Sequence, residues 1–253
     1  MGPLRNPIAG LAFVGAMLVA GAGPAAANGL RYDWGGLYVG TSLGAVWGNI
    51  EHDHYAEAVA PGPFILDPDF NSGIWGLHVG LQHQFGAGLF IGVEGGLSRS
   101  AFDEWEASEV CPTPPIQANS TCNQQLRWLA TIGPRVGWGF DRWMVYATGG
   151  VAIGRMQSWY TFTDTGARRF PGFEGNATST GWFAGLGAEW AITDNLLLGV
   201  EYQHYDLDSE RATEQLAPTD NDNIALASEG DVVRARLSFK LGRTPQVLRE
   251  PLK

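Results

Sequence analysis

Eight ionisable side chains occur in segments where apolar residues alternate with glycines and small polar residues. They stand on the glycine-containing side of this alternation: His78, Glu94, Arg127, Arg135, Glu189, Glu201, Arg234 and Arg236. If that side faces an interior, the charges must be paired, because an unpaired buried charge is very costly. Glu94 comes level with Arg135 when residues are counted from the same end of each segment. Glu201 comes level with Arg236 in the same way. The pattern predicts a layer of salt bridges, which either plugs the interior or acts as a gated charge switch in a narrow pore.

Some histidines could in principle support catalysis or metal binding. His204 is the best-placed histidine for an acyl hydrolase by its position in the alternation, but no serine or acid is clearly placed beside it. His52 and His54 lie two residues apart in an acidic stretch, where an extended chain could present both to a metal or haem iron. An exposed acidic loop explains them more simply. We expect no enzymatic activity, no cofactor and no metal site.

Two cysteines, Cys111 and Cys122, flank a short segment that contains three prolines. In an oxidising compartment, cysteines this close in sequence predict one disulfide that pins a loop. The spacing does not match a zinc site, and two thiols alone do not supply its usual four ligands.

The first 27 residues have the parts of a secretory signal peptide. Arg5 supplies positive charge, residues 8–22 are apolar, and small residues precede a cleavage site after Ala27. A membrane anchor is the alternative, but the apolar run is shorter than the ~20 residues of a helical span. No later run reaches that length, which leaves an exported soluble protein or a membrane β-barrel. The net charge of −10 and the pI near 4.9 argue against nucleic acid as a partner.

The rest of the chain repeats segments with a period of two residues, which is the pattern of β-strands. Eight strands are predicted, at residues 35–49, 73–85, 88–101, 124–140, 142–157, 179–192, 196–206 and 231–241. Three short turns, 86–88, 141–142 and 193–195, alternate with four long loops, 50–72, 102–123, 158–178 and 207–230. This alternation is typical of outer-membrane barrels, with short periplasmic turns and long extracellular loops. We predict an all-β fold: one eight-stranded antiparallel up-and-down transmembrane β-barrel over residues 28–241, with a short periplasmic tail at 242–253.

Each predicted strand has an apolar face and a face of glycines and charges. Glycine weakens strands, but in a narrow lumen it leaves room for long side chains from neighbouring strands. We therefore predict that the apolar face contacts lipid. That face also carries aromatic residues near the strand ends, as membrane interfaces do: Trp47, Trp75, Trp128, Trp138, Trp143, Trp182, Trp190 and Tyr202.

Two stretches resemble a known family: residues 133–152, GPRVGWGFDRWMVYATGGVA, and residues 181–195, GWFAGLGAEWAITDN. They are similar to the small porin-like outer-membrane β-barrel proteins of Gram-negative bacteria, which include OmpA-type membrane domains and opacity- and porin-like surface antigens. The resemblance implies an outer-membrane location and a role as envelope structure, surface antigen or adhesin; some members bind haem or form pores. Such chains commonly end at an aromatic residue that the barrel-insertion machinery reads, whereas here Phe239 is followed by further residues.

The predicted partners follow from this location. We expect contact with outer-membrane lipid and lipopolysaccharide, and with the barrel-insertion machinery. The acidic loops could bind an unidentified extracellular ligand, or divalent cations that bridge to lipopolysaccharide; a solvated, variable surface is the simpler interpretation. The favoured function is a non-enzymatic barrel that supports the envelope and displays its loops, with a lumen plugged by charged side chains. A small-solute or ion pore and a haem or host-ligand receptor are the alternatives.

Overall fold

Ten β-strands make up the part of the chain that the structure describes. This computed structural model describes residues 32–55, 64–85, 88–100, 105–111, 119–168, 175–217 and 220–241. The strands are β1 (Gly36–Tyr55), β2 (Phe64–Leu66), β3 (Asp69–Gln84), β4 (Leu89–Ser100), β5 (Trp105–Val110), β6 (Ser120–Phe140), β7 (Trp143–Phe162), β8 (Gly175–Ala191), β9 (Leu196–Ala217) and β10 (Asp220–Leu241). Within these ranges no helix is long and apolar enough to cross a membrane. The predicted signal peptide (1–27) and tail (242–253) lie outside the described residues.

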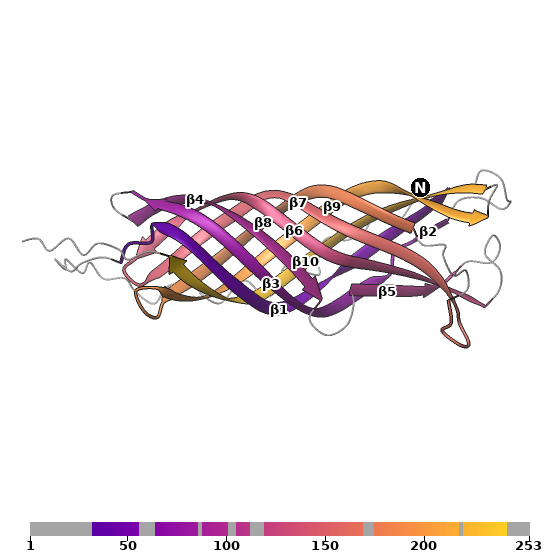
Figure 1. Cartoon of the computed structure of the whole chain (residues 1–253), viewed down its shortest axis with the longest axis horizontal. Helices are drawn as coiled ribbons and strands as arrows, with labels where there is room; N and C mark the ends of the chain where they lie inside the picture. Colours follow the sequence, from indigo (N-terminus) through magenta and orange to yellow (C-terminus); the bar gives the residue numbers. More distant parts are fainter. Residues whose placement is uncertain are drawn as a thin grey trace, which may run out of the picture. The chain divides into compact units, whose positions relative to one another are not determined.

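Eight of these strands form a closed antiparallel ring, seen from the side in Figure 1. Neighbours follow chain order through β1, β3, β4, β6, β7, β8, β9 and β10. The ring closes where β10 pairs with β1, from Leu37↔Leu241 to Tyr55↔Asn223. The short strands β2 and β5 pair with β1 and β6 respectively. A closed ring satisfies the backbone groups of every strand, which lipid requires. The predicted eight-stranded up-and-down barrel is confirmed.

Short turns join the strands at the end of the barrel where β1 begins and β10 ends. Between β6 and β7, Asp141 has a φ of 52°, a conformation that aspartate adopts more readily than most residues. The turn from β3 to β4 includes Gly88 with a φ of 106°, where a side chain would be strained. Between β8 and β9 the Thr193 hydroxyl accepts a hydrogen bond from the N–H of Leu196 at 2.9 Å. These turns lie where the sequence predicts them.

At the opposite end of the barrel, most of the ring strands extend further than the sequence pattern predicts, although β4 does not. β9 continues to Ala217 and β10 begins at Asp220, so most of the predicted loop 207–230 is an antiparallel ladder. β2 and β5 likewise lie inside the predicted loops 50–72 and 102–123. Crossing a bilayer takes about 9–11 residues of a tilted strand, so strands of 20 to 22 residues reach beyond it. Strand ends outside the lipid need no apolar face. Their residues therefore do not alternate between apolar and polar, which is the pattern that predicts a strand.

The apolar face of the ring is exposed, and the face with glycines and charges is buried. Leu43, Leu77 and Leu186 are exposed by 57%, 53% and 58%, whereas Arg135 and Glu189 are exposed by 1% and 0%. This much exposed apolar surface would be unfavourable in water and is stable against lipid. The predicted assignment of the two faces therefore agrees with the structure over most of each strand.

Candidate functional site

Six charged side chains from five strands meet inside the barrel. They are Glu94 of β4, Arg135 of β6, Glu189 of β8, Glu201 of β9, and Arg234 and Arg236 of β10. Each occupies an inward position because successive side chains of a strand point to opposite faces. Three carboxylates meet three guanidinium groups, so this charged layer is neutral in a chain of net charge −10. Such pairing lowers the cost of burying charge.

Arg236 lies at the centre of the charged layer. Its Nη2 is 2.5 Å from Oε2 of Glu94, and its Nη1 is 2.6 Å from Oε2 of Glu201. Its Nε is 3.5 Å from Oε1 of Glu189, an ion-pair contact without a hydrogen bond. One guanidinium thus joins carboxylates from three strands. The pairing of Glu201 with Arg236 is present, and two further acids share the same arginine.

Arg135 extends into the charged layer from β6. Its Nη2 is 2.5 Å from Oε1 of Glu189, while its Nη1 is 3.5 Å from Oε2 of Glu94. The guanidinium carbon lies 3.6 Å from the centre of the Tyr146 ring, close enough for a cation–π contact. Nη1 also donates a hydrogen bond to the Tyr38 hydroxyl at 2.9 Å. Glu189 is therefore the closer acidic partner of Arg135, ahead of Glu94.

Arg234 and His78 extend the polar part of the lumen. Arg234 donates from Nε and Nη2 to Oε1 of Glu201, at 2.8 and 2.5 Å, and from Nη2 to Oε1 of Gln203 at 3.0 Å. Nε2 of His78 lies 2.8 Å from the hydroxyl of Ser238. Among the described residues, none of the ion pairs includes His78. His78 therefore contributes to the lumen through its contact with Ser238.

Two tyrosines complete the charged layer, and the sequence analysis did not include them. The Tyr38 hydroxyl donates to Glu94 at 2.6 Å, and the Tyr146 hydroxyl donates to Glu201 at 2.7 Å. Gly187 leaves the space for Tyr146, since a Cβ at that position would overlap the tyrosine ring. Both tyrosines stand on the glycine-containing face of the alternation, which was the signal available in the sequence.

Arg127 does not belong to the charged layer, so its assignment to the lumen is wrong. The register between β6 and β7 shifts between Leu126 and Trp128, which marks a β-bulge. Leu126 and Leu129 are buried, whereas Arg127 is exposed and Trp128 is partly exposed. The extra residue of a bulge resets the alternation of the strand. Arg127 and Trp128 consequently both lie on the outer face.

Apolar side chains fill the lumen on both sides of the charged layer. A cluster near the short turns consists of Trp34, Phe90, Met144, Tyr146, Ala191 and Leu197. A larger cluster towards the long connections includes Val46, Ile50, Phe70, Ile74, Leu126, Leu129, Met156, Phe183, Leu207, Leu226 and Val232. Below, these are called the lower and upper apolar clusters. The charged layer lies between them.

The predicted interface aromatics lie on the outer face. Seven are exposed by 37–56%, namely Trp47, Trp75, Trp138, Trp143, Trp182, Trp190 and Tyr202. Trp128 is partly exposed. Near the short turns Trp143 stacks on Trp190, with ring centroids 5.7 Å apart. Aromatic rings near both ends of the apolar band match the two membrane interfaces of a barrel.

His204 has an acidic neighbour that the sequence analysis did not place there. Its Nδ1 lies 3.0 Å from Oδ1 of Asp231, and the same oxygen accepts a hydrogen bond from the Tyr202 hydroxyl at 2.6 Å. In the described part of the chain no serine is hydrogen-bonded to His204, so this group has no Ser–His–acid arrangement. The side chains of His52 and His54 lie outside the described residues.

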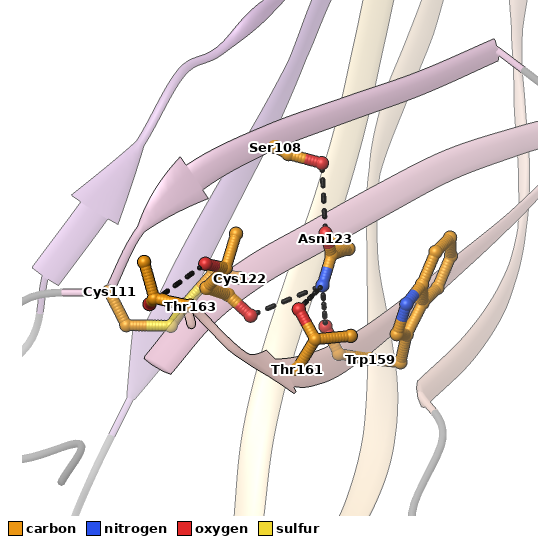
Figure 2. The surroundings of a disulfide bond; sticks show 8 residues. Ser108, Cys111, Cys122, Asn123, Trp159, Thr161 and Thr163 are labelled. Carbon is orange, nitrogen blue, oxygen red and sulfur yellow. Dashed lines mark hydrogen bonds between the residues drawn. A yellow bond between two sulfur atoms is a disulfide. The ribbon is translucent and has the colours of Figure 1, made fainter. Parts of the chain in front are cut away.

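Cys111 and Cys122 form a disulfide, as predicted. It links the end of β5 to β6 beside a hydrogen-bonded group around Asn123 (Figure 2). The Asn123 amide donates to Oγ1 of Thr161 on β7 at 3.1 Å and accepts a bond from the Ser108 hydroxyl on β5 at 2.8 Å. The covalent bond and these contacts together hold β5 beside β6 and β7.

Reducing this disulfide should loosen β5 while the ring of eight strands stays intact. The bond spans 11 residues of sequence, and β5 pairs with β6 outside the ring path. A disulfide contributes about 2–4 kcal/mol, so local opening of residues 105–111 should rise about tenfold or more. Cleavage after the exposed Glu106 and Glu109 by a glutamyl protease, located by mass spectrometry, measures this opening. Equal cleavage rates with and without reductant would contradict the prediction.

A family model described as the outer membrane protein beta-barrel domain matches residues 12–228. The chain belongs to this outer-membrane β-barrel family. Two relatives are the 31 kDa outer-membrane immunogenic proteins of Brucella melitensis and Brucella suis, each 27% identical over 228 residues, covering 86% of this chain and 88% of the relative. The crystal structure of outer membrane protein OprG from Pseudomonas aeruginosa covers 83% of this chain and 99% of its own, with 12% identity and a TM-score of 0.51.

These comparisons agree with the resemblance that the sequence analysis stated. This outer-membrane barrel is located in the outer membrane of a Gram-negative bacterium. The likeness to OprG supports the fold alone, because the identity is low. The relationship to the Brucella proteins extends over most of both chains, so the barrel is also similar to a surface antigen.

Proposed function

We propose that this protein is a non-enzymatic component of the outer membrane whose lumen is plugged and whose long strand ends are displayed outside the cell. The observation that carries the proposal is the neutral charged layer between two apolar clusters. Its hub, Arg236, is 1% exposed. A barrel of this kind supports the envelope by its own stability and offers a surface to the outside.

The argument for a plug rests on the width of the barrel and on the cost of moving an ion past apolar side chains in the lumen. An eight-stranded barrel is just wide enough for side chains to fill it. An ion crossing this lumen would have to pass buried Phe90 and Met144 in the lower apolar cluster, then Met156 and Phe183 in the upper one. Opening the charged layer would also separate several ion pairs at once where water cannot replace them. Both costs favour a plug over a gated pore.

The case for display comes from the long strand ends. Asp208 and Glu210 of β9 are exposed, as are Glu106 and Glu109 of β5. Like charges on an acidic outer surface make copies of the protein repel one another, and they keep the exposed strand ends well solvated. The similarity to outer-membrane immunogenic proteins of Brucella supports an antigen-like surface.

Single-channel recording of the refolded protein in a planar bilayer tests the plug. We expect no conductance steps from the wild-type protein, with folding shown in the same sample by heat-dependent gel migration. The double variant Arg135→Ala with Arg236→Ala removes two of the three lumenal guanidinium groups and serves to show whether a disturbed lumen is detectable. Reproducible wild-type steps that change in Glu94→Gln would make the charged layer a gate and overturn the proposal.

A further inference from the structure

Three exposed arginines lie on the outer face of adjacent strands, at the upper edge of the apolar band. They are Arg99 of β4, Arg127 of β6 and Arg155 of β7. On β4, Arg99 is the next outward residue after Leu97, and on β7, Arg155 is the next after Ile153. Each arginine therefore marks the level at which its strand leaves the hydrocarbon. Below, the three are called the basic rim.

Tryptophans stand beside the basic rim in the strand register. Arg99 pairs across the sheet with Trp75 of β3, and Arg155 pairs with Trp128 of β6. Tryptophan is favoured at the level of lipid head groups. Strands in a sheet are about 4.8 Å apart, so the backbones of Arg99 and Arg155 are separated by roughly 10 Å. The bulge in β6 adds Arg127 between them on the outer face.

Within the described part of the chain, no acidic side chain forms an ion pair with the basic rim, that is, with Arg99, Arg127 or Arg155. The outward acids Glu106 and Glu109 of β5 pair with positions of β6 that lie further from the lipid.

Elsewhere the upper edge is acidic. Asp206 of β9 is partly exposed, Glu229 of β10 is exposed, and Asp231 of β10 is bonded to Tyr202 and His204. At this level, among the described residues, the arginines lie on β4, β6 and β7, whereas acids lie on β9 and β10. This contrast points to an anionic molecule that approaches from the membrane side.

We propose that the basic rim binds the phosphate groups of a phosphorylated glycolipid of the outer leaflet, as in the lipid A part of lipopolysaccharide. Guanidinium groups match phosphate geometry and form strong charge-assisted hydrogen bonds with it. The acyl chains of the same molecule lie along the apolar column below, formed on these strands by Leu97, Ile132 and Val151. This binding is direct and needs no divalent cation, unlike a bridge through the acidic loops. It is independent of whether the lumen conducts.

The test compares two variants that lose the same charge. The rim variant carries Arg99→Gln, Arg127→Gln and Arg155→Gln. The control variant carries Arg142→Gln, Arg168→Gln and Arg211→Gln, which are exposed arginines elsewhere on the barrel. All six side chains are exposed, so both variants should fold, and heat-dependent gel migration checks this. Retention of bisphosphorylated lipid A by the full-chain protein in detergent micelles is measured by native mass spectrometry, with EDTA present.

We expect the rim variant to retain bisphosphorylated lipid A about tenfold less than wild type, and the control variant to retain it within about twofold. Wild type should also discriminate by about tenfold against lipid A from which both phosphates have been removed. Equal loss in the two variants would overturn the proposal, because it would show an effect of net charge alone. Equal binding of the two lipids, or loss of wild-type binding in EDTA, would overturn it as well. If the rim variant does not fold, the three single variants are compared with Arg142→Gln, and retention equal to that control overturns the proposal.

Discussion

Replacing Arg236 with methionine is expected to lower the free energy of unfolding of the barrel by about 3–5 kcal/mol. The side chain is 1% exposed and contacts Glu94, Glu189 and Glu201. Its removal leaves three carboxylates with two guanidinium groups in a lumen where little water can solvate the excess charge. Urea unfolding of the protein in lipid vesicles, followed by tryptophan fluorescence, measures the change.

Two further variants separate the loss of charge from the loss of packing. Leu237→Met changes the adjacent lipid-facing residue of β10 and should cost less than about 1.5 kcal/mol. Adding Glu94→Gln to Arg236→Met restores equal numbers of acids and bases and should recover part of the lost stability. If Arg236→Met lowers the free energy of unfolding no more than Leu237→Met does, the charged layer does not stabilise the barrel as predicted.

Gly133→Ala is expected to destabilise the barrel by about 2–3 kcal/mol although it adds a single methyl group. A Cβ at Gly133 would overlap backbone atoms of Gly149 and Gly150 on β7. Backbone cannot rotate aside as a side chain can, so β6 and β7 would have to separate. The same urea unfolding experiment gives the difference in the free energy of unfolding.

Gly95→Ala is the matched control for this prediction. Gly95 pairs with Ile132, immediately beside Gly133 in the sheet. A Cβ at Gly95 would meet the carbonyl oxygen of Thr131 at 3.7 Å, an ordinary contact. Because alanine reduces the freedom of the unfolded chain, the change should be neutral or stabilising by about 0.4–1 kcal/mol. Equal costs at the two glycines would show that strand propensity, rather than close approach, governs both.

Charge is distributed unevenly between the interior and the exterior of this barrel. The lumenal layer is balanced, so the net charge of −10 belongs to the rest of the chain. The basic rim stands out against that acidic background. Stability and surface recognition are therefore served by separate sets of arginines, which the two mutational series above can distinguish.

Much of the fold followed from local pattern. The period-two alternation predicted the ring strands, and the combination of glycine with charge on one face identified the lumen. The short turns were predictable because only two or three residues separate the alternating segments there, and in the structure Gly88 and Asp141 adopt positive φ. The upper strand ends were not, because residues beyond the lipid, such as those of β9 after Asp206, no longer alternate between apolar and polar.

The sequence by itself determined the barrel, its two faces, the disulfide between Cys111 and Cys122, and the set of charges from which the lumenal layer is built. It could not determine which charges meet, because partners such as Glu94 and Arg236 are 142 residues apart and their contact depends on the register and tilt of every intervening strand. Nor could it place Arg127, whose face is set by one extra residue in β6. Only the tertiary structure made Arg236 the hub of the lumen, because closure of the ring fixes pairings that no local alternation encodes, and only the register shift in β6 turned Arg127 outward.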